Sequence, residues 1–432
     1  PLVRWVMGDG HRELWAVPVE APVLDLDSYA GGLTPLRLGG GQQTTSLRFR
    51  AADGRTFQFR SIDKDGARTL DPLLRRSLAA DLLQDRISAL MPLSAMVVAE
   101  LLDAAGILHP NPELAVMPDD PALGEFRERF AGMLGWIEER PDEVGDGEPG
   151  FASSARVVGS DRLLERLEER YDNRVDAGSY LRARLVDALV GDWDRHPDQW
   201  RWAGFENDLG QLVFEAVPRD RDWALTRLDG MTAIFTGFIW PHYVTFDADY
   251  PSAFRASWSA RVLDRRILPL LSWSEWEEEV ASLSEAIDDA VIERAVGRLP
   301  VSYRTRVGDE LIHNLKSRRR DLSRFAREHY ELLAGWVDLD TTDEDELARL
   351  ERLPNGRVRV EVFRLEEGRP APEPRFRRVF DPEVTREVRI DLHGGDDRVE
   401  VSGATVSPIR LRIEGGGSDD AYEVEGAGDR IH

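Results

Sequence analysis

The sequence predicts an α+β protein in three successive parts: a β-rich N-terminal part, a helical middle and a small all-β C-terminal part. Three observations carry this prediction. Apolar and polar residues alternate over residues 47–59, apolar residues recur at helical spacing through most of 73–336, and the alternation returns from residue 357. Alternation is typical of a strand with one buried face, and a spacing of three to four residues is typical of an amphipathic helix.

We expect the boundaries of these parts at residues 1–118 (an N-terminal extension and a β-rich lobe), 119–338 (a helical lobe) and 354–432 (a β domain). The 432-residue chain is too long for one ordinary hydrophobic core. Its 42% hydrophobic and 31% charged residues are typical of a folded chain.

The composition also excludes several kinds of chemistry. A net charge of −24 repels phosphate backbones, so no nucleic-acid partner is expected. The chain has no cysteine, which excludes disulfides, thiolate catalysis and cysteine-ligated zinc. No apolar run approaches the ~20 residues that span a bilayer, so no transmembrane segment is expected.

The first element with a clear pattern is a β-hairpin preceded by a glycine-rich turn. Three glycines at 39–41 lead into an alternating strand at 47–50, and a second alternating strand follows at 57–60. Asp53-Gly54 between them is a strong hairpin-turn signal. Lys64 then lies at the end of the second strand.

Lysine is scarce in this chain. Only Lys64 and Lys316 occur, against 54 arginines. A lysine is a compact point charge that suits a phosphate, so we interpret Lys64 as functional. Lys316 lies beside Arg318-Arg319-Arg320, a run that we interpret as a solvated helix face.

The middle of the chain alternates short strands with amphipathic helices. Pro92 interrupts the first helical stretch, and Gly191 ends the last helix before a polar cluster. The expected helices are 73–105, 126–139, 161–171, 176–190 and most of 255–336, and the expected strands are 114–117, 200–202 and 212–217.

The C-terminal part contains two similar glycine- and aspartate-bearing turns. Residues 394–397 read Gly-Gly-Asp-Asp and residues 415–420 read Gly-Gly-Gly-Ser-Asp-Asp, each after an alternating strand. Ordinary tight turns are the preferred interpretation. Ca²⁺ binding in a β-roll is the alternative, since repeated turns of this type bind Ca²⁺ in such folds.

The densest polar cluster spans residues 191–200, Gly-Asp-Trp-Asp-Arg-His-Pro-Asp-Gln-Trp, between an apolar helix and a short strand. About twenty residues later, Arg219-Asp220-Arg221-Asp222 follows a second short strand. Carboxylates at the ends of neighbouring strands can converge on a divalent cation, and a further carboxylate can accept a proton.

This arrangement resembles the atypical kinases, namely the phosphatidylinositol kinases, the bacterial HipA-type kinases and the secretory-pathway kinases. Asp194-Arg195-His196 followed by Gln199 is similar to their catalytic loop, and the similarity covers roughly residues 36–225. It implies a two-lobed protein-kinase-like fold, with a β-rich N-lobe and a helical C-lobe, that binds ATP in the cleft between them.

The resemblance implies a role for each matching residue of the catalytic loop. Asp194 would be the base or orient the acceptor hydroxyl, with His196 beside it. Gln199 replaces the metal-binding asparagine of these families, and Asp220 would hold Mg²⁺ or Mn²⁺. Asp222 is the neighbouring alternative to Asp220.

On the nucleotide side, the resemblance implies that Gly39, Gly40 and Gly41 cover the phosphates. Lys64 would contact the α and β phosphates, with Arg60 as the alternative cation. The expected acidic partner of this cation is Asp85, with Glu100 as the second choice. The acceptor, whether protein, lipid or small molecule, stays open.

Two other classes of function stay open. A metal-dependent phosphohydrolase would use Asp192, Asp194, His196 and Asp220 as ligands and would not need Lys64. A catalytically inactive interaction module would leave these acids diverging into solvent.

A weaker resemblance is to a segment of bacterial cell-envelope proteins that carry a calcineurin-like phosphoesterase. The Gly8–His11 segment is superficially similar to a phosphoesterase loop, and we interpret it as a surface turn. This resemblance favours a periplasmic or envelope location, with the cytoplasm as the alternative.

Overall fold

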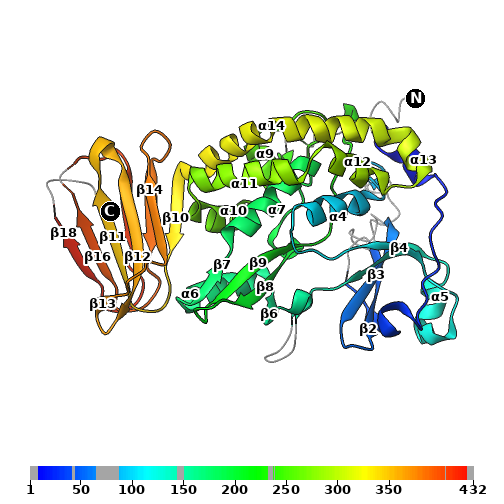
Figure 1. Ribbon diagram of the computed structural model, residues 1–432, viewed down its shortest axis with the longest axis horizontal. Coiled ribbons are helices and arrows are strands. Elements are labelled where there is room, and N and C mark those ends of the chain that lie inside the picture. Colours follow the sequence, from blue (N-terminus) through cyan, green and yellow to red (C-terminus); the bar gives the residue numbers. More distant parts are fainter. Residues whose placement is uncertain are drawn as a thin grey trace.

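The computed structural model describes residues 8–40, 44–64, 87–143, 150–231, 237, 239–403 and 405–425. These form a mixed α and β structure with a β-rich C-terminal region. In Figure 1 an N-terminal sheet lies at one end, helices fill the middle, and the C-terminal β region lies at the far end. Three separate hydrophobic cores correspond to the N-terminal sheet, the helical middle and the C-terminal β region.

The N-terminal sheet has five antiparallel strands in the order β1-β2-β3-β5-β4. They are β1 Leu33–Leu38, β2 Thr44–Ala51, β3 Thr56–Lys64, β4 Glu113–Val116 and β5 Leu134–Glu139. The predicted hairpin is confirmed, with Gly54 in its turn at φ +89°. Phe57 and Phe59 face the core of this sheet. Because side chains alternate along a strand, Gln58, Arg60 and Lys64 share the other face.

The predicted helix at 126–139 is wrong in its second half. Only a 3-10 turn at Pro121–Phe126 and the short helix α5 (Arg127–Phe130) are helical, and Leu134–Glu139 is strand β5. Gly132 at φ +74° ends the helical stretch. Trp136 and Ile137 are both buried because β5 lies inside the sheet, and two adjacent buried residues hide the alternation of a strand. This sheet therefore extends beyond the boundary expected at residue 118.

A second, four-stranded sheet contains the hairpin that leads to the candidate site. Its order is β6-β8-β9-β7, with β6 Arg156–Val158, β7 Asn173–Val175, β8 Trp200–Glu206 and β9 Leu212–Pro218. Strands β8 and β9 are antiparallel, with Trp200 opposite Pro218. The residues before β8 and after β9 therefore lie side by side.

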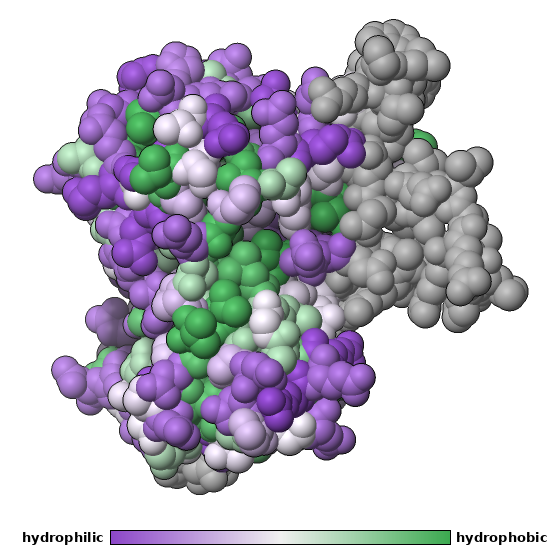
Figure 2. All heavy atoms as spheres, turned by 90° about the vertical axis from the view of Figure 1, so that its right-hand side faces the viewer, coloured by the Kyte–Doolittle hydropathy of each residue, from purple (hydrophilic) through white to green (hydrophobic). Residues whose placement is uncertain are grey.

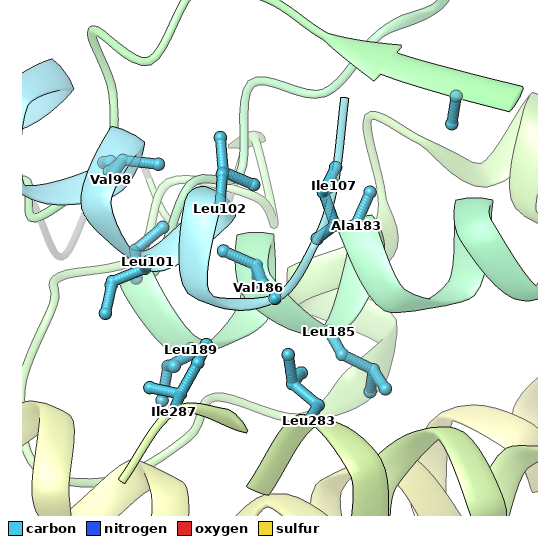
Figure 3. Packing of buried hydrophobic residues seen from close by; sticks show 14 of the residues in the cluster. Val98, Leu101, Leu102, Ile107, Ala183, Leu185, Val186, Leu189, Leu283 and Ile287 are labelled. Atoms are coloured by element: carbon cyan, nitrogen blue, oxygen red, sulfur yellow. The ribbon is translucent and has the colours of Figure 1, made fainter. Parts of the chain in front are cut away.

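The helices pack around one large core. Helix α4 (Ser94–Ala104) packs on α7 (Ala177–Val190), and Leu283 and Ile287 at the end of α11 (Trp273–Ala286) complete the contact (Figure 3). Gly191 ends α7 at φ +67°, as predicted. The remaining helices are α2 Arg12–Trp15, α6 Ser160–Glu169, α9 Ala253–Ser257, α10 Arg261–Ile267, α12 Asp289–Gly297, α13 Val301–Tyr303 and α14 Asp309–Ala334.

Hydrophobic and hydrophilic residues are unevenly distributed on the surface at the N-terminal-sheet end of the molecule. Figure 2 shows the face at the right of Figure 1, where hydrophobic residues gather in a band between mainly hydrophilic upper and lower areas. Within the described ranges, no helix combines the length and the apolar character needed to cross a bilayer.

The C-terminal β region begins at Trp336, before the boundary expected at 354. Strands β10 (Trp336–Asp340), β15 (Glu387–Asp391) and β17 (Arg410–Glu414) form a parallel sheet. The opposite sheet stacks β11, β16 and β18 in parallel and adds the antiparallel strands β12, β13 and β14. Their bounds are β11 Glu346–Arg352, β12 Val358–Glu366, β13 Arg369–Pro370, β14 Phe376–Phe380, β16 Arg398–Ser402 and β18 Ala421–Val424. Three acidic turns, at 341–345, 392–397 and 415–420, therefore lie one above another.

Candidate active site

The turn after β9 has a strained backbone. Asp220 has φ +52°, which is uncommon for a residue with a side chain. Its carbonyl and that of Arg219 accept hydrogen bonds from Arg195 Nη1 at 3.1 and 2.7 Å. The carbonyl of Arg221 accepts a hydrogen bond from Ser94 Oγ at the start of α4, at 2.8 Å. The turn is thus held by both the loop before β8 and helix α4.

Two cations from β3 reach the carboxylates of this turn. Arg60 Nη1 lies 2.8 Å from Asp220 Oδ2, and Lys64 Nζ lies 2.6 Å from Asp222 Oδ2. Arg60 also lies 3.8 Å from Asp222. These residues are mostly buried, so the pairs are far less screened than exposed ones. The N-terminal sheet and the end of β9 therefore meet through charges, and the roles expected for Lys64 and Asp220 stay predictions.

Burial would raise the pKa of both carboxyls, and the two respond differently. At Asp220 the nearby Arg60 and Lys64 outweigh burial and hold the pKa below its usual value. At Asp222 burial and the charge of Asp220 prevail and raise the pKa. Asp220 Oδ1 is buried and accepts no hydrogen bond from the described residues. A buried, ionised oxygen without a donor fits a divalent cation, for which carboxylate oxygens are preferred ligands.

Asp194 lies in the loop between α7 and β8. Burial raises its pKa, and the charge of Asp220 raises it further, whereas His196, Arg195 and Lys64 act in the opposite direction. Asp194 is thus close enough to Asp220 and Lys64 to interact electrostatically with both. The three residues on which the resemblance depends most are brought together.

A buried network of charged side chains holds the loop between α7 and β8 in place. Asp187 on α7 is fully buried and contacts Arg221 and Arg195, the latter at 3.3 Å. Asp192 lies 3.4 Å from Arg221, and burial raises its pKa to about 6. The supporting role of Arg195 and Arg221 was not predicted from the sequence. The sequence signal that could have indicated this role is the position of Arg195 and Arg221 directly after Asp194 and Asp220.

The glycine turn lies on the same side as Lys64. Thr44, just after the turn, pairs with Lys64 across β2 and β3. Gly39 donates its N–H to the Ser46 carbonyl at 2.8 Å, and a Cβ at Gly39 would collide with Ser46 Oγ. Gly40 has open space around it. Gly41 and Asp85 lie outside the described residues, so their predicted roles stay predictions.

The other predicted residues of the catalytic loop lie at its rim. The side chain of His196 is 42% exposed, and its Nε2 lies 3.3 Å from Gln199 Nε2. The carbonyl of Gln199 accepts a hydrogen bond from the Arg219 N–H at 2.9 Å, so Gln199 adjoins the end of β9. Glu100, the second choice as partner of Lys64, lies 3.5 Å from Arg294 instead.

The phosphohydrolase alternative finds little support in these contacts. Asp192 contacts arginines, and His196 lies at the rim. Among the described residues, a group of three acids and histidines whose ligand atoms all lie within 4.8 Å of one another is formed by Glu168, Asp340 and His393, which belong to α6, to β10 and to the turn after β15. Arg266 contacts both Glu168 and Asp340. Ca²⁺ at the C-terminal turns stays a prediction.

Comparison with known proteins gives kinases and kinase-like proteins. No family model and no curated protein matches this sequence. The Helicobacter pylori proinflammatory kinase CtkA is similar in structure, with 9% identity and a TM-score of 0.35 over 66% of this chain and 94% of that chain. Shewanella oneidensis HipA, solved with HipB and operator DNA, has 13% identity and a TM-score of 0.30 over 72% and 68%.

The Rio2 kinase of Chaetomium thermophilum, solved with ADP, Mg²⁺ and phosphoaspartate, has 11% identity and a TM-score of 0.32 over 67% of this chain and 71% of that chain. All three scores lie below 0.5, so the interpretation of the site depends on the contacts described above. The suggested kinship with envelope phosphoesterases stays a prediction.

Proposed function

We propose that this protein is a kinase-like phosphotransferase that binds ATP and Mg²⁺ between the N-terminal sheet and the β8–β9 hairpin. The observation that carries the proposal is the pairing of Arg60 and Lys64, from β3, with Asp220 and Asp222 after β9. It joins cations suited to phosphate and carboxylates suited to Mg²⁺ at one point.

Each residue has a role in this proposal. Asp220 would hold Mg²⁺, with Asp222 and the amide oxygen of Gln199 as further ligands. Bound Mg²⁺ would neutralise charge on the phosphates. Lys64 and Arg60 would then turn from the carboxylates toward phosphate oxygens, and the N–H groups of the glycine turn would cover them.

Transfer itself would need a proton acceptor at Asp194. The acceptor hydroxyl oxygen forms a bond to the γ-phosphorus, the bond between that phosphorus and the β,γ-bridging oxygen breaks, and ADP leaves. The hydroxyl proton passes to Asp194. The raised pKa of this carboxyl suits proton transfer, because a base works best when its pKa approaches the working pH.

Transfer of labelled phosphate from γ-labelled ATP, to the protein itself or to an added extract, tests this proposal. We expect Asp194→Asn to reduce the rate by about 10²–10⁴ while ATP still binds. Asp198→Asn is the matched control, because Asp198 lies four residues after Asp194 and its side chain is 93% exposed. Equal rates in wild type and Asp194→Asn would contradict the proposed role.

An inactive, kinase-like interaction module is the second candidate. One observation favours it: both cations already neutralise the carboxylates that would hold the metal. If the two cations stay paired with these carboxylates when nucleotide is added, neither wild type nor Asp194→Asn transfers phosphate. ATP with Mg²⁺ then gives no binding signal.

A further inference from the structure

Four arginines gather beside the candidate site. Arg48 lies on β2, Arg140 follows β5, Arg201 lies on β8 and Arg219 follows β9. Arg48 is opposite Gln58 on β3, and Arg140 Nη1 donates to Gln58 Oε1 at 2.8 Å. Two of the arginines thus belong to the N-terminal sheet and two to the β8–β9 hairpin that faces it.

The four guanidinium groups are close enough to repel one another. Arg201 is opposite Val217 across β8 and β9, two residues before Arg219, so these two arginines adjoin on one face of the hairpin. Burial, followed by the charge of Arg140, lowers the pKa of Arg48 and of Arg201. Four like charges on four separate elements are unfavourable unless an anion lies among them.

Carboxylates lie beside these arginines, with Glu138 near Arg219 and with Asp142, Glu143 and Asp198 near Arg201, but they do not reach every donor. Asp142 pairs with Arg140 Nε, and Glu143 accepts from the Gly159 N–H at 3.2 Å. Arg48 Nε and Arg219 Nη1 are buried and have no hydrogen-bond partner among the described residues. A buried donor without an acceptor is costly, so an anionic group that accepts from both atoms would be stabilised here.

We propose that Arg48, Arg140, Arg201 and Arg219 form a subsite for a phosphate group. The planar guanidinium fork matches two phosphate oxygens, which makes arginine the preferred residue for such binding. The existence of this subsite does not depend on catalysis. Its ligand rests on the proposed function: it is either a phosphate of the bound nucleotide or a phosphate on the acceptor.

The position of the subsite separates it from the metal-binding end. Gln58, opposite Arg48, and Lys64 are six residues apart on β3, or roughly 20 Å along the strand at ~3.3 Å per residue. Arg219, next to Asp220, lies between the two ends. A single phosphate group cannot contact both Arg48 and Lys64, so the cleft accommodates either a long ligand with two anionic groups or two ligands.

Calorimetric titration of the full chain with tripolyphosphate, without metal, tests the subsite. We expect Arg219→Gln and Arg48→Gln each to weaken binding at least tenfold. Arg50→Gln is the matched control, because Arg50 is an exposed arginine two residues along the same strand, and we expect it to bind within twofold of wild type. Unchanged binding in both Arg48→Gln and Arg219→Gln would overturn the proposal.

Conservative variants guard against a folding defect. Arg219→Lys and Arg48→Lys keep the charge and lose the fork, so we expect severalfold weaker binding with an unchanged thermal midpoint. Wild-type affinity in both lysine variants would contradict recognition by guanidinium forks.

Asp220→Asn separates this proposal from the proposed function. The subsite predicts that Asp220→Asn still binds tripolyphosphate, whether or not ATP with Mg²⁺ binds. If Arg219→Gln also weakens ATP with Mg²⁺, the subsite holds a nucleotide phosphate. If it weakens only tripolyphosphate and phosphorylated serine peptides, the subsite holds the acceptor. Tripolyphosphate binding that depends on Asp220 and not on the arginines would overturn the subsite alone.

Discussion

Arg195 holds the two halves of the candidate site together. It is fully buried, donates to the carbonyls of Arg219 and Asp220, lies over the ring of Trp200 and contacts Asp187. The residue is next to the proposed base, yet its side chain points into the protein. It is a positioning residue, because it fixes the turn that carries Asp220 relative to Asp194.

We expect Arg195→Gln to lower the free energy of unfolding by about 3 kcal/mol, since it removes one partner from a buried charge network. Urea denaturation measures this. Arg162→Gln, an exposed arginine in a surface pair, is the control and should change stability by less than about 1 kcal/mol. A loss in Arg195→Gln as small as in the control would contradict the structural role.

Individual residues of the site could be predicted from the sequence, but the ion pairs between them could not. Asp194, Asp220 and Lys64 were found from local patterns, and the structure brings them together. Arg60 pairs with Asp220 across 160 positions of the chain, and no local pattern predicts such a contact. The burial of Arg195 could not be predicted either, because it depends on a contact with Asp187 on the preceding helix α7.

At the scale of elements, the end of α7 sets the start of the catalytic loop. Gly191 has φ +67°, and a Cβ there would lie 3.1 Å from Phe246 Cδ2 and 3.2 Å from Arg318 Nη1. We expect Gly191→Ala to cost about 1–2 kcal/mol for the left-handed backbone alone. It should also reduce ATP binding, because Asp194 follows three residues later. Thermal melting measures the first effect and calorimetry the second; wild-type values in both would contradict this role of the cap.

Helices α7, α10 and α14 are joined by a buried cluster around Asp264. Its carboxylate accepts from Tyr180 Oη at 2.7 Å and from Arg184 at 2.9 and 3.1 Å, and His329 lies at 3.3 Å. Burial would raise the pKa of Asp264, yet Arg184 and His329 together outweigh burial and lower the pKa to about 2.

Because this folded-state pKa lies below the ~3.9 of an unfolded aspartate, the stability it contributes is present above pH 4 and lost as the pH falls toward 2. We expect Asp264→Asn to be less stable at pH 7 by about 3–5 kcal/mol. The variant should also lose part of the decline between pH 4 and 2. Chemical denaturation at a series of pH values measures both, and identical pH profiles would contradict the assignment.

The elements were easier to predict where one signal dominated. Asp53-Gly54 and Gly191 indicated a turn and a helix end, and both predictions are confirmed. Strand β5 was missed because its own residues show no clear alternation. It is a strand because it pairs with β3 on one side and β4 on the other. Strands β10 and β11 were missed although Gly335 stands between α14 and β10.

At the scale of the whole molecule, the C-terminal β region should respond separately to pH. Asp397 is buried between stacked turns, and burial together with the neighbouring Glu346, Asp420 and Asp345 raises its pKa to about 7. A raised folded-state pKa contributes stability that is present below pH 4 and lost as the pH rises through 7.

We expect a lower thermal midpoint for this region at pH 8.5 than at pH 5. Asp397→Asn should remove most of the difference, since an amide keeps the acceptor for the Glu346 N–H at 2.8 Å without the charge. Calorimetric scans at the two pH values measure this.

Added Ca²⁺ tests the open prediction for these turns: a rise in the midpoint at pH 8.5 would support a cation there.

The most direct test of a nucleotide site at Asp220 is a thermal-shift titration with ATP and Mg²⁺. A ligand that binds only the folded state stabilises it by about 1.4 kcal/mol at tenfold its dissociation constant. We predict a metal-dependent rise of the midpoint in wild type and in Asp198→Asn, and none in Asp220→Asn. No rise in folded wild type with millimolar nucleotide, or an equal rise in Asp220→Asn, would contradict a nucleotide–metal site built on Asp220.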